Sequence, residues 1–319
     1  MLCKSPVLLI FFNRPETLKI TFEKIRKARP RKLYLAQDGP RDNCESDPEN
    51  IKLCREIVDN IDWECQVFRN YSEENMGCGR GPYSAISWFF SNEECGIVLE
   101  DDCVASDSFF TFCDEMLEKY RCDERVFLIT GCNLELKTKD VDSSYFFGYS
   151  GTNWGWASWK RCWSEMDYCC SFTKDKYVIN NLRTMLIRMQ HDKGRKEIKL
   201  FLDTFKRLEK GENISYWDVQ WQAIRYLNHQ LSIIPSCNLI TNIGIGNTST
   251  HAKNFKTPKG YYDGIGKVNF YYNKRYEMEF PLKHPKYLIQ NTRYDQAVDK
   301  KLYPSFCIKV LKKLGLFGD

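Results

Sequence analysis

The sequence has no apolar stretch long enough to cross a membrane. A spanning helix needs about 18 or more consecutive apolar residues, and no window of the 319-residue chain approaches that length. The longest early run, Pro6–Phe12, is too short for the core of a secretory signal and ends at Asn13 without a small-residue cleavage site. We therefore expect a cytoplasmic protein that neither spans a membrane nor is exported.

Paired cysteine spacings are also missing. The chain has 15 Cys, an odd number, and no two of them are spaced as CxxC, which argues against a zinc ribbon and against a redox motif. Without an export signal we expect these residues to stay reduced, most of them as small residues of the core. The pattern argues against a small secreted domain held together by disulfides.

Two common phosphate-binding motifs are absent. The glycine-rich segment Asn75–Gly81 (NMGCGRG) is not followed by the Lys-Ser/Thr pair of a P-loop, and it lacks the GxGxxG spacing of a dinucleotide site. Arg80 within this segment is still a candidate contact for a phosphate group.

Excess charge is found at only one end of the chain. The sequence has 47 Lys and Arg against 42 Asp and Glu, and residues 283–319 account for the whole difference of +5, with eight basic residues and three Asp. Residues 1–282 therefore balance to zero, and we expect no broad face that follows a phosphate backbone. Nucleic acid is not an expected partner.

The chain does contain enough apolar material for a core, since 43% of its residues are hydrophobic. In the first half, apolar runs of strand length alternate with amphipathic helical segments. The expected strands are Pro6–Phe12, Lys32–Gln37, Cys65–Arg69, Gly96–Leu99 and Val126–Thr130. This alternation predicts an α/β fold, in which a mostly parallel sheet has helices on both faces. Further on, we expect a polar helical stretch at 175–210 and short strands at 232–235 and 238–242.

Charged residues follow three of the expected strands. Arg14 follows the first strand, Asp38 the second, and Glu100-Asp101-Asp102 the fourth. The carboxyl ends of parallel strands meet at one edge, where ligands bind in open α/β sheets. Carboxylates at such an edge suit Mg²⁺ or Mn²⁺, which would neutralise a diphosphate. The alternatives are a solvated acidic turn for the triplet and an ordinary Asp-Gly-Pro turn for Asp38.

The segment that contains the triplet, GIVLEDDCVASDSFFTF, resembles the nucleotide-sugar site of GT-A glycosyltransferases. It is most similar to relatives of the N-acetylglucosaminyltransferases that build complex N-glycans, and the resemblance extends from Pro6 to about Phe255. It implies a Rossmann-like GT-A fold and a metal-dependent hexosyl- or N-acetylhexosaminyltransferase. Such an enzyme moves a sugar from a nucleoside-diphosphate donor, here UDP-linked, to a hydroxyl of a glycan or lipid-linked acceptor.

The resemblance also assigns roles on the donor side. The family's counterpart of Arg14 meets the donor diphosphate, and the counterpart of Asp38 hydrogen-bonds the uracil edge. The counterparts of Glu100 and Asp101 contact the ribose and the sugar. The last acid of the triplet binds the metal, which implies Asp102 as the ligand of Mn²⁺ or Mg²⁺.

On the acceptor side, the resemblance makes Asp218, in Tyr-Trp-Asp, the catalytic base of an inverting reaction. Trp156 and Trp217 match acceptor-side tryptophans, and His251 matches a His in a loop that closes over the donor. The segment at His251 carries one inserted residue, which departs from the family pattern. The alternatives are a helix cap for Asp218 and core positions for the tryptophans.

The implied organisation is a GT-A domain over residues 1–255, with a donor half at 1–130 and an acceptor half at 131–255. Residues 256–319 form an extension without a family match. Its end, 304–319, has apolar and Lys residues on opposite helical faces, which predicts a basic amphipathic helix. Such a helix can contact the inner face of an anionic membrane or dock on the protein body.

Two other functional classes are left open. A sugar nucleotidyltransferase also uses carboxylates and Mg²⁺ on a similar sheet, but it normally has a glycine-rich basic segment after the first strand, which FFNRPET lacks. A carbohydrate-binding protein that has lost catalysis would keep the aromatic residues. The presence of both Asp102 and Asp218 argues against that class.

Overall fold

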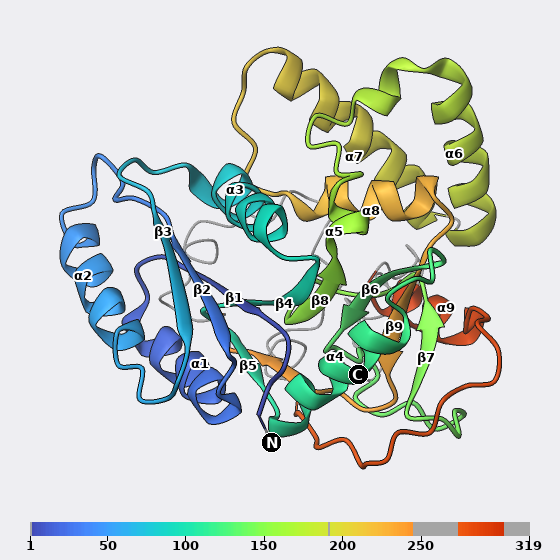
Figure 1. Ribbon diagram of the computed structural model, residues 1–319. Coiled ribbons are helices and arrows are strands. Elements are labelled where there is room, and N and C mark those ends of the chain that lie inside the picture. Colours follow the sequence, from blue (N-terminus) through green and yellow to red (C-terminus); the bar gives the residue numbers. More distant parts are fainter. Residues whose placement is uncertain (1, 191, 245–273, 303–319) are drawn as a thin grey trace, which may run out of the picture.

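The protein is built around one mixed sheet. The computed structural model describes residues 2–190, 192–244 and 274–302, and within these ranges eight strands pair in the order β3-β2-β1-β4-β8-β6-β9-β7 (Figure 1). Four of the seven neighbouring pairs are parallel, and three are antiparallel. The predicted α/β fold with a mostly parallel sheet is therefore confirmed.

In the first half of the chain, strands alternate with helices as predicted. In chain order these are β1 (Val7–Phe11), α1 (Pro15–Ala28), β2 (Lys32–Gln37), α2 (Asp47–Val58), β3 (Gln66–Tyr71), α3 (Gly77–Asn92) and β4 (Cys95–Glu100). The strand order runs outward from β1 to β3 and then returns to β4 on the other side of β1. Right-handed crossovers therefore place α1 and α2 on one face of the sheet and α3 on the opposite face.

The second half is less regular. It contains β5 (Cys103–Ala105), α4 (Asp107–Lys119), β6 (Val126–Thr130), β7 (Tyr145–Gly148), β8 (Trp156–Trp159), α5 (Lys160–Trp163), η1 (Ser171–Lys174), α6 (Lys176–Gln190), α7 (Asp192–Glu209), α8 (Asp218–Leu227), β9 (Leu231–Pro235), β10 (Ile240–Asn242) and α9 (Thr292–Leu302). The expected helical stretch at 175–210 and the two short strands after 230 are confirmed. Strand β10 pairs antiparallel with β5 in a separate two-stranded ribbon.

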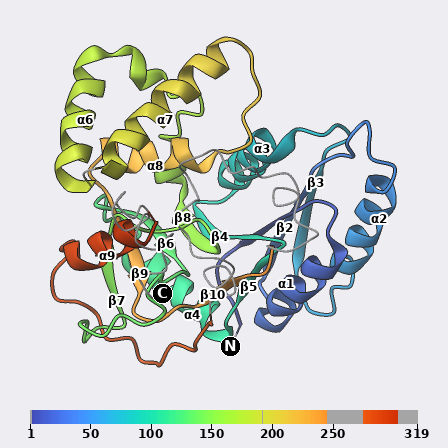
Figure 2. The same ribbon diagram turned by 180° about the vertical axis from the view of Figure 1, so that it is seen from behind.

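Helices α6 and α7 pack against each other, and α7 packs on α8. Figures 1 and 2 show this pair from both sides, at the end of the molecule opposite the N-terminus. None of the helices in the described ranges combines the length and the apolar character that a bilayer span requires. Of the fourteen cysteines in these ranges, seven are buried and none forms a disulfide.

The described part of the expected C-terminal extension belongs to the main body. Tyr294 and Val298 of α9 pack with residues of β7 and β9 in a small apolar cluster. Asp295 is buried and accepts hydrogen bonds from the backbone N–H groups of Tyr149 (3.0 Å) and Ser150 (2.9 Å). The expected boundary at residue 255 and the expected helix at 304–319 lie outside the described residues.

Candidate functional site

Three parallel strands end together at one edge of the sheet. In the register of β1 with its neighbours, Phe11 lies beside Gln37 of β2, and Ile10 lies beside Glu100 of β4. Arg14, Asp38 and the acidic triplet follow these positions directly in the sequence. The prediction that they share one edge is confirmed.

Arg14 joins the loop after β1 to the acidic triplet. Its Nε donates to Asp101 Oδ2 (3.2 Å), and its Nη2 donates to Asp102 Oδ2 (2.9 Å) and forms a close ion pair with Asp101 Oδ1. Burial opposes the charge on Arg14, but the two carboxylates outweigh it and raise the pKa of the guanidinium. Arg14 is therefore held in its charged form beside two carboxylates.

The acidic cluster carries more negative charge than Arg14 offsets. Burial raises the pKa of Glu100, and the charges of Asp102 and Asp101 raise it further, whereas Arg14 acts in the opposite direction. Asp218, which is distant in sequence, also contributes to this rise. The fold therefore brings Asp218 close enough to act on the triplet.

Asp102 is placed by two different segments. Its Oδ1 accepts hydrogen bonds from Asn242 Nδ2 (3.2 Å) and Cys103 Sγ (3.5 Å), while Oδ2 accepts one from Arg14. A carboxylate oxygen has two lone pairs, so Oδ2 keeps one for another ligand. An oxygen donor in a cluster with excess negative charge fits a hard divalent cation.

The ribbon of β5 and β10 holds this carboxylate in place. The backbone of Ile243 donates to the Asp102 carbonyl (2.9 Å), and Asn242 Oδ1 accepts from the N–H of Gly244 (2.8 Å). A Cβ on Gly244 would lie 2.0 Å from Asp102 Oδ2, so only glycine allows this approach. Sequence reasoning missed Asn242 and Gly244, although both stand at the end of an expected strand.

The described part of the chain has no group of three or more His, Cys, Asp or Glu side chains that could hold a metal. A cation at Asp102 would therefore take most of its ligands from water and from a bound diphosphate. Mg²⁺ and related ions commonly bind proteins through one or two carboxylates in this way.

Asp38 holds the start of α3. Its Oδ1 accepts from the backbone N–H groups of Met76 (2.8 Å) and Gly39 (3.0 Å), and its Oδ2 accepts from Gly77 N–H (2.8 Å) and Asn75 Nδ2 (3.2 Å). All four lone pairs of the carboxylate are used. Asp38 therefore has a structural role at this turn, as the alternative interpretation of the Asp-Gly-Pro segment predicts. A contact between Asp38 and a nucleobase would have to displace one of these four donors.

The loop between β2 and α2 is fixed by an ion pair between exposed Arg41 and buried Asp47. Asp47 is fully buried and accepts from Arg41 Nε (2.7 Å) and Asn13 Nδ2 (2.6 Å). The hydrogen bonds from Arg41 hold the pKa of Asp47 well below its usual range. Since Asn13 precedes Arg14, this pair connects the loops that follow β1 and β2.

Asp218 is the first residue of α8. The residue is in part accessible to solvent. The protein around its carboxylate nevertheless removes enough water to raise the pKa, whereas hydrogen bonds from the backbone N–H groups of Asp218 and Val219 act to lower it. Carboxylates are favourable at a helix N-terminus because the unpaired N–H groups of the first turn point toward them. The N-cap position of α8 is held by Trp217, so the helix-cap alternative is wrong for Asp218, whose place in the first turn is compatible with a catalytic role.

Trp156 and Trp217 lie in the core rather than on an acceptor surface. Trp156 exposes none of its surface and Trp217 only 5%. Their ring centroids lie 5.9 Å apart, both rings pack on Trp163, and Trp156 also packs on Trp221. These contacts hold the start of α8, so the two tryptophans position Asp218 and do not line the site. His251 lies outside the described residues.

The glycine-rich segment allows a close contact between the first half of the chain and the second. A Cβ on Gly79, in the first turn of α3, would lie 2.1 Å from the backbone oxygen of Ile214. Ile214 belongs to the segment that leads to Asp218. Gly79 therefore lets α3, which is anchored by Asp38, pack directly on the loop that carries Asp218. The contact of Arg80 with a phosphate is still a prediction.

Replacing Gly79 with alanine will destabilise the protein, because the backbone of Ile214 must move to admit the new methyl group. We expect a loss of about 1–3 kcal/mol, as is typical of overpacking, measured by urea unfolding. Gly81→Ala is the matched control in the same helix. Its Cβ would meet Asp38 Oδ2 at 3.4 Å, an ordinary contact, so we expect a gain of about 0.5–1 kcal/mol. Equal stability of the two variants would contradict the proposed packing.

Comparisons with known proteins add little to this geometry. No family model matches the chain, and no curated protein matches it. Three solved structures share part of the fold. HddC from Yersinia pseudotuberculosis is 12% identical, with 49% of this chain and 77% of that chain covered and a TM-score of 0.31.

The second is 4-diphosphocytidyl-2C-methyl-D-erythritol synthase from Anaerococcus prevotii, which is 13% identical over 50% of this chain and 73% of that chain, with a TM-score of 0.31. The third is the UTP-bound UGPase from Acinetobacter baumannii, which is 9% identical over 50% of this chain and 77% of that chain, with a TM-score of 0.29. Likeness at this level says nothing about the reaction. The function of the protein is therefore inferred from the residues at the carboxyl edge of the parallel strands.

Proposed function

We propose that this protein is a metal-dependent, inverting glycosyltransferase of the GT-A class, with a UDP-linked sugar as donor and a hydroxyl of a glycan or glycolipid as acceptor. One observation carries the proposal. Arg14 pairs with Asp101 and Asp102 at the carboxyl edge of the parallel strands, and the charge of Asp218 raises the pKa of Glu100 in the same cluster. A charged donor site and a separate carboxylate for the acceptor are the groups that sugar transfer needs.

Asp102 would hold a divalent cation through the free lone pair of Oδ2. Bound there, Mn²⁺ or Mg²⁺ would neutralise charge on the leaving diphosphate. Arg14 would add to this stabilisation from the protein side. A guanidinium has five N–H donors, and the described carboxylates engage Nε and Nη2, which leaves Nη1 for a phosphate oxygen.

Asp218 would accept the proton of the acceptor hydroxyl as the new glycosidic bond forms. Its raised pKa makes it a stronger base than an ordinary aspartate. The aromatic core beneath Trp217 fixes the start of α8, so the carboxylate is positioned before the acceptor binds. A single base on the side opposite the leaving group gives inversion, and an α-linked donor then gives a β-linked product.

Calorimetric titration with a panel of nucleotide-sugars, with and without Mn²⁺, tests the proposal. We expect one UDP-sugar to bind in the presence of Mn²⁺, and we expect EDTA to weaken this binding on the order of 10²-fold. Chromatography of the products should show release of UDP when an acceptor is present. Release of pyrophosphate from a nucleoside triphosphate and a sugar phosphate would instead identify a nucleotidyltransferase. Binding of glycans without binding of any nucleotide-sugar would identify a carbohydrate-binding protein.

A further inference from the structure

The helices α6 and α7 concentrate positive charge. Residues 176–209 contain nine Lys and Arg and four Asp and Glu, a net charge of +5, which equals that of the whole chain. Residues 1–282 have a net charge of zero, so the part of this region outside residues 176–209 carries a net charge of −5. Positive and negative charge are therefore unevenly distributed along the chain. The balance over residues 1–282 therefore does not describe the charge of this helix pair.

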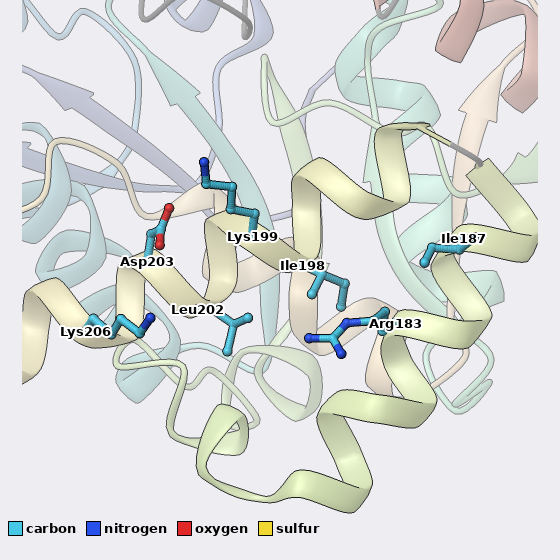
Figure 3. Close-up of a pocket in the computed structure, with 7 residues that line it drawn as sticks. All are labelled: Arg183, Ile187, Ile198, Lys199, Leu202, Asp203 and Lys206. Carbon is cyan, nitrogen blue, oxygen red and sulfur yellow. The ribbon is translucent and has the colours of Figure 1, made fainter.

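A groove runs between the two helices. It has a volume of about 310 Å³, and an apolar floor is formed by Ile187, Ile198 and Leu202. Arg183, Lys199 and Lys206 stand along its rim with a single acid, Asp203 (Figure 3). Arg183, Lys199, Asp203 and Lys206 are all exposed, whereas Ile198 is buried and the other two floor residues are half-buried.

The basic residues on the rim are not paired with an acid in the part of the chain that the structure describes. Arg183, Lys199 and Lys206 form no ion pair with a carboxylate among the residues that the structure describes, and Arg183 Nη1 lies 3.5 Å from the amide oxygen of Asn180. Elsewhere on the surface, basic residues such as Arg26 and Arg293 are paired with acids. Exposed cations that have no acidic partner among the described residues, beside an apolar floor, are complementary to an anionic amphiphile.

We propose that the α6–α7 face docks on a membrane surface rich in anionic phospholipid. The rim would bind headgroup phosphates, and the apolar floor would take the adjoining glycerol and acyl region of a lipid. A duplex nucleic acid would use the positive rim but would leave the apolar floor unoccupied, so the charges and the floor together favour lipid. This face is separate from the expected helix at 304–319, and the proposal does not depend on the reaction that the protein catalyses.

Co-sedimentation of the full-length protein with vesicles tests the proposal. We expect binding to vesicles of phosphatidylcholine with 30% phosphatidylserine, and none to phosphatidylcholine alone. A lysine near an anionic surface adds about a factor of five to the partition coefficient, so the double variant K199E/K206E should lose about 25-fold or more. Binding should weaken from low to high salt, because counterions screen the interaction.

The double variant K4E/K19E is the matched control, since it changes the net charge equally. Both lysines are exposed and lie in the N-terminal segment and in α1, at the opposite end of the molecule (Figure 1). We expect it to bind like the parent, and both variants keep residues 303–319, so any contribution of the C-terminus is common to them. Thermal unfolding confirms that both are folded.

Three results would overturn the proposal. The first is a parent protein that does not sediment with anionic vesicles at low salt. The second is equal binding of K199E/K206E and K4E/K19E, which would place the lipid contact elsewhere. The third is tighter binding of a 20-base-pair DNA duplex than of the vesicles, lost in K199E/K206E, because the face would then be a nucleic-acid surface.

Discussion

Replacing Asp102 with alanine will abolish the effect of Mn²⁺ or Mg²⁺ on nucleotide-sugar binding. Asp102 is the one direct protein ligand that we propose for the cation, so the variant loses the link between metal and protein. Because a cation contributes several kcal/mol at a diphosphate, we expect donor affinity in Mn²⁺ to fall on the order of 10²-fold, to the value measured in EDTA. Calorimetric titrations with UDP, one at fixed Mn²⁺ and one in EDTA, give the two affinities.

The contacts around Asp102 indicate that this variant will fold. Arg14 keeps its two contacts with Asp101, so removal of Asp102 leaves no unpaired buried guanidinium. Asp107→Ala is the control, because Asp107 is an exposed acid near the triplet that pairs with Lys24 and Lys27. The control should keep the parental response to metal. A metal-dependent affinity that is unchanged in Asp102→Ala would contradict the site.

The carboxyl edge of the sheet could be predicted from the sequence because its signals are local. A buried parallel strand appears as a continuous apolar run, and β1, β2 and β4 each appear in this form. The residues that follow such strands must lie at one edge, whatever the exact pairing. The predicted proximity of Arg14 and the triplet needed no more than this rule.

The contacts that hold this edge together depend on distant segments. Asn242 reaches Asp102 only because β10 pairs with β5, and Gly79 meets Ile214 across the two halves. Strand β8 was not predicted, because its sequence, WASW, is buried at every residue and shows no alternation. Its tryptophans were therefore left with two interpretations, an acceptor surface or the core, and the structure places them in the core.

The roles of single acids were the least predictable part of the site. Asp38 stands at the end of a strand, as a donor-binding residue would, but its carboxylate is saturated by the start of α3. Burial and hydrogen-bond saturation are tertiary properties, and the sequence next to an acid does not report them. The same limit applies to charge, since the sum over residues 1–282 hides the positive helix pair α6–α7.

Replacing Asp218 with asparagine will remove sugar transfer and leave donor binding nearly intact. The variant lacks the general base, for which the expected loss in kcat is on the order of 10²–10⁴-fold. Asparagine keeps the size and shape of aspartate, so α8 should keep its start and the tryptophans beneath it should keep their packing. Steady-state kinetics with the donor and acceptor identified by the binding screen, together with the Kd for UDP, separate the two effects.

The pH dependence of the parent provides a second test of Asp218, because a base must be deprotonated to act. Its raised pKa places the acidic limb of kcat/KM above the ordinary value of about 3.9 for aspartate, so activity should rise with pH through that limb. The limb should be absent from the residual activity of Asp218→Asn. Glu212→Gln, an exposed acid in the preceding loop that pairs with Arg207, should keep both the rate and the limb. If Asp218→Asn transfers sugar at the parental rate, another residue is the base.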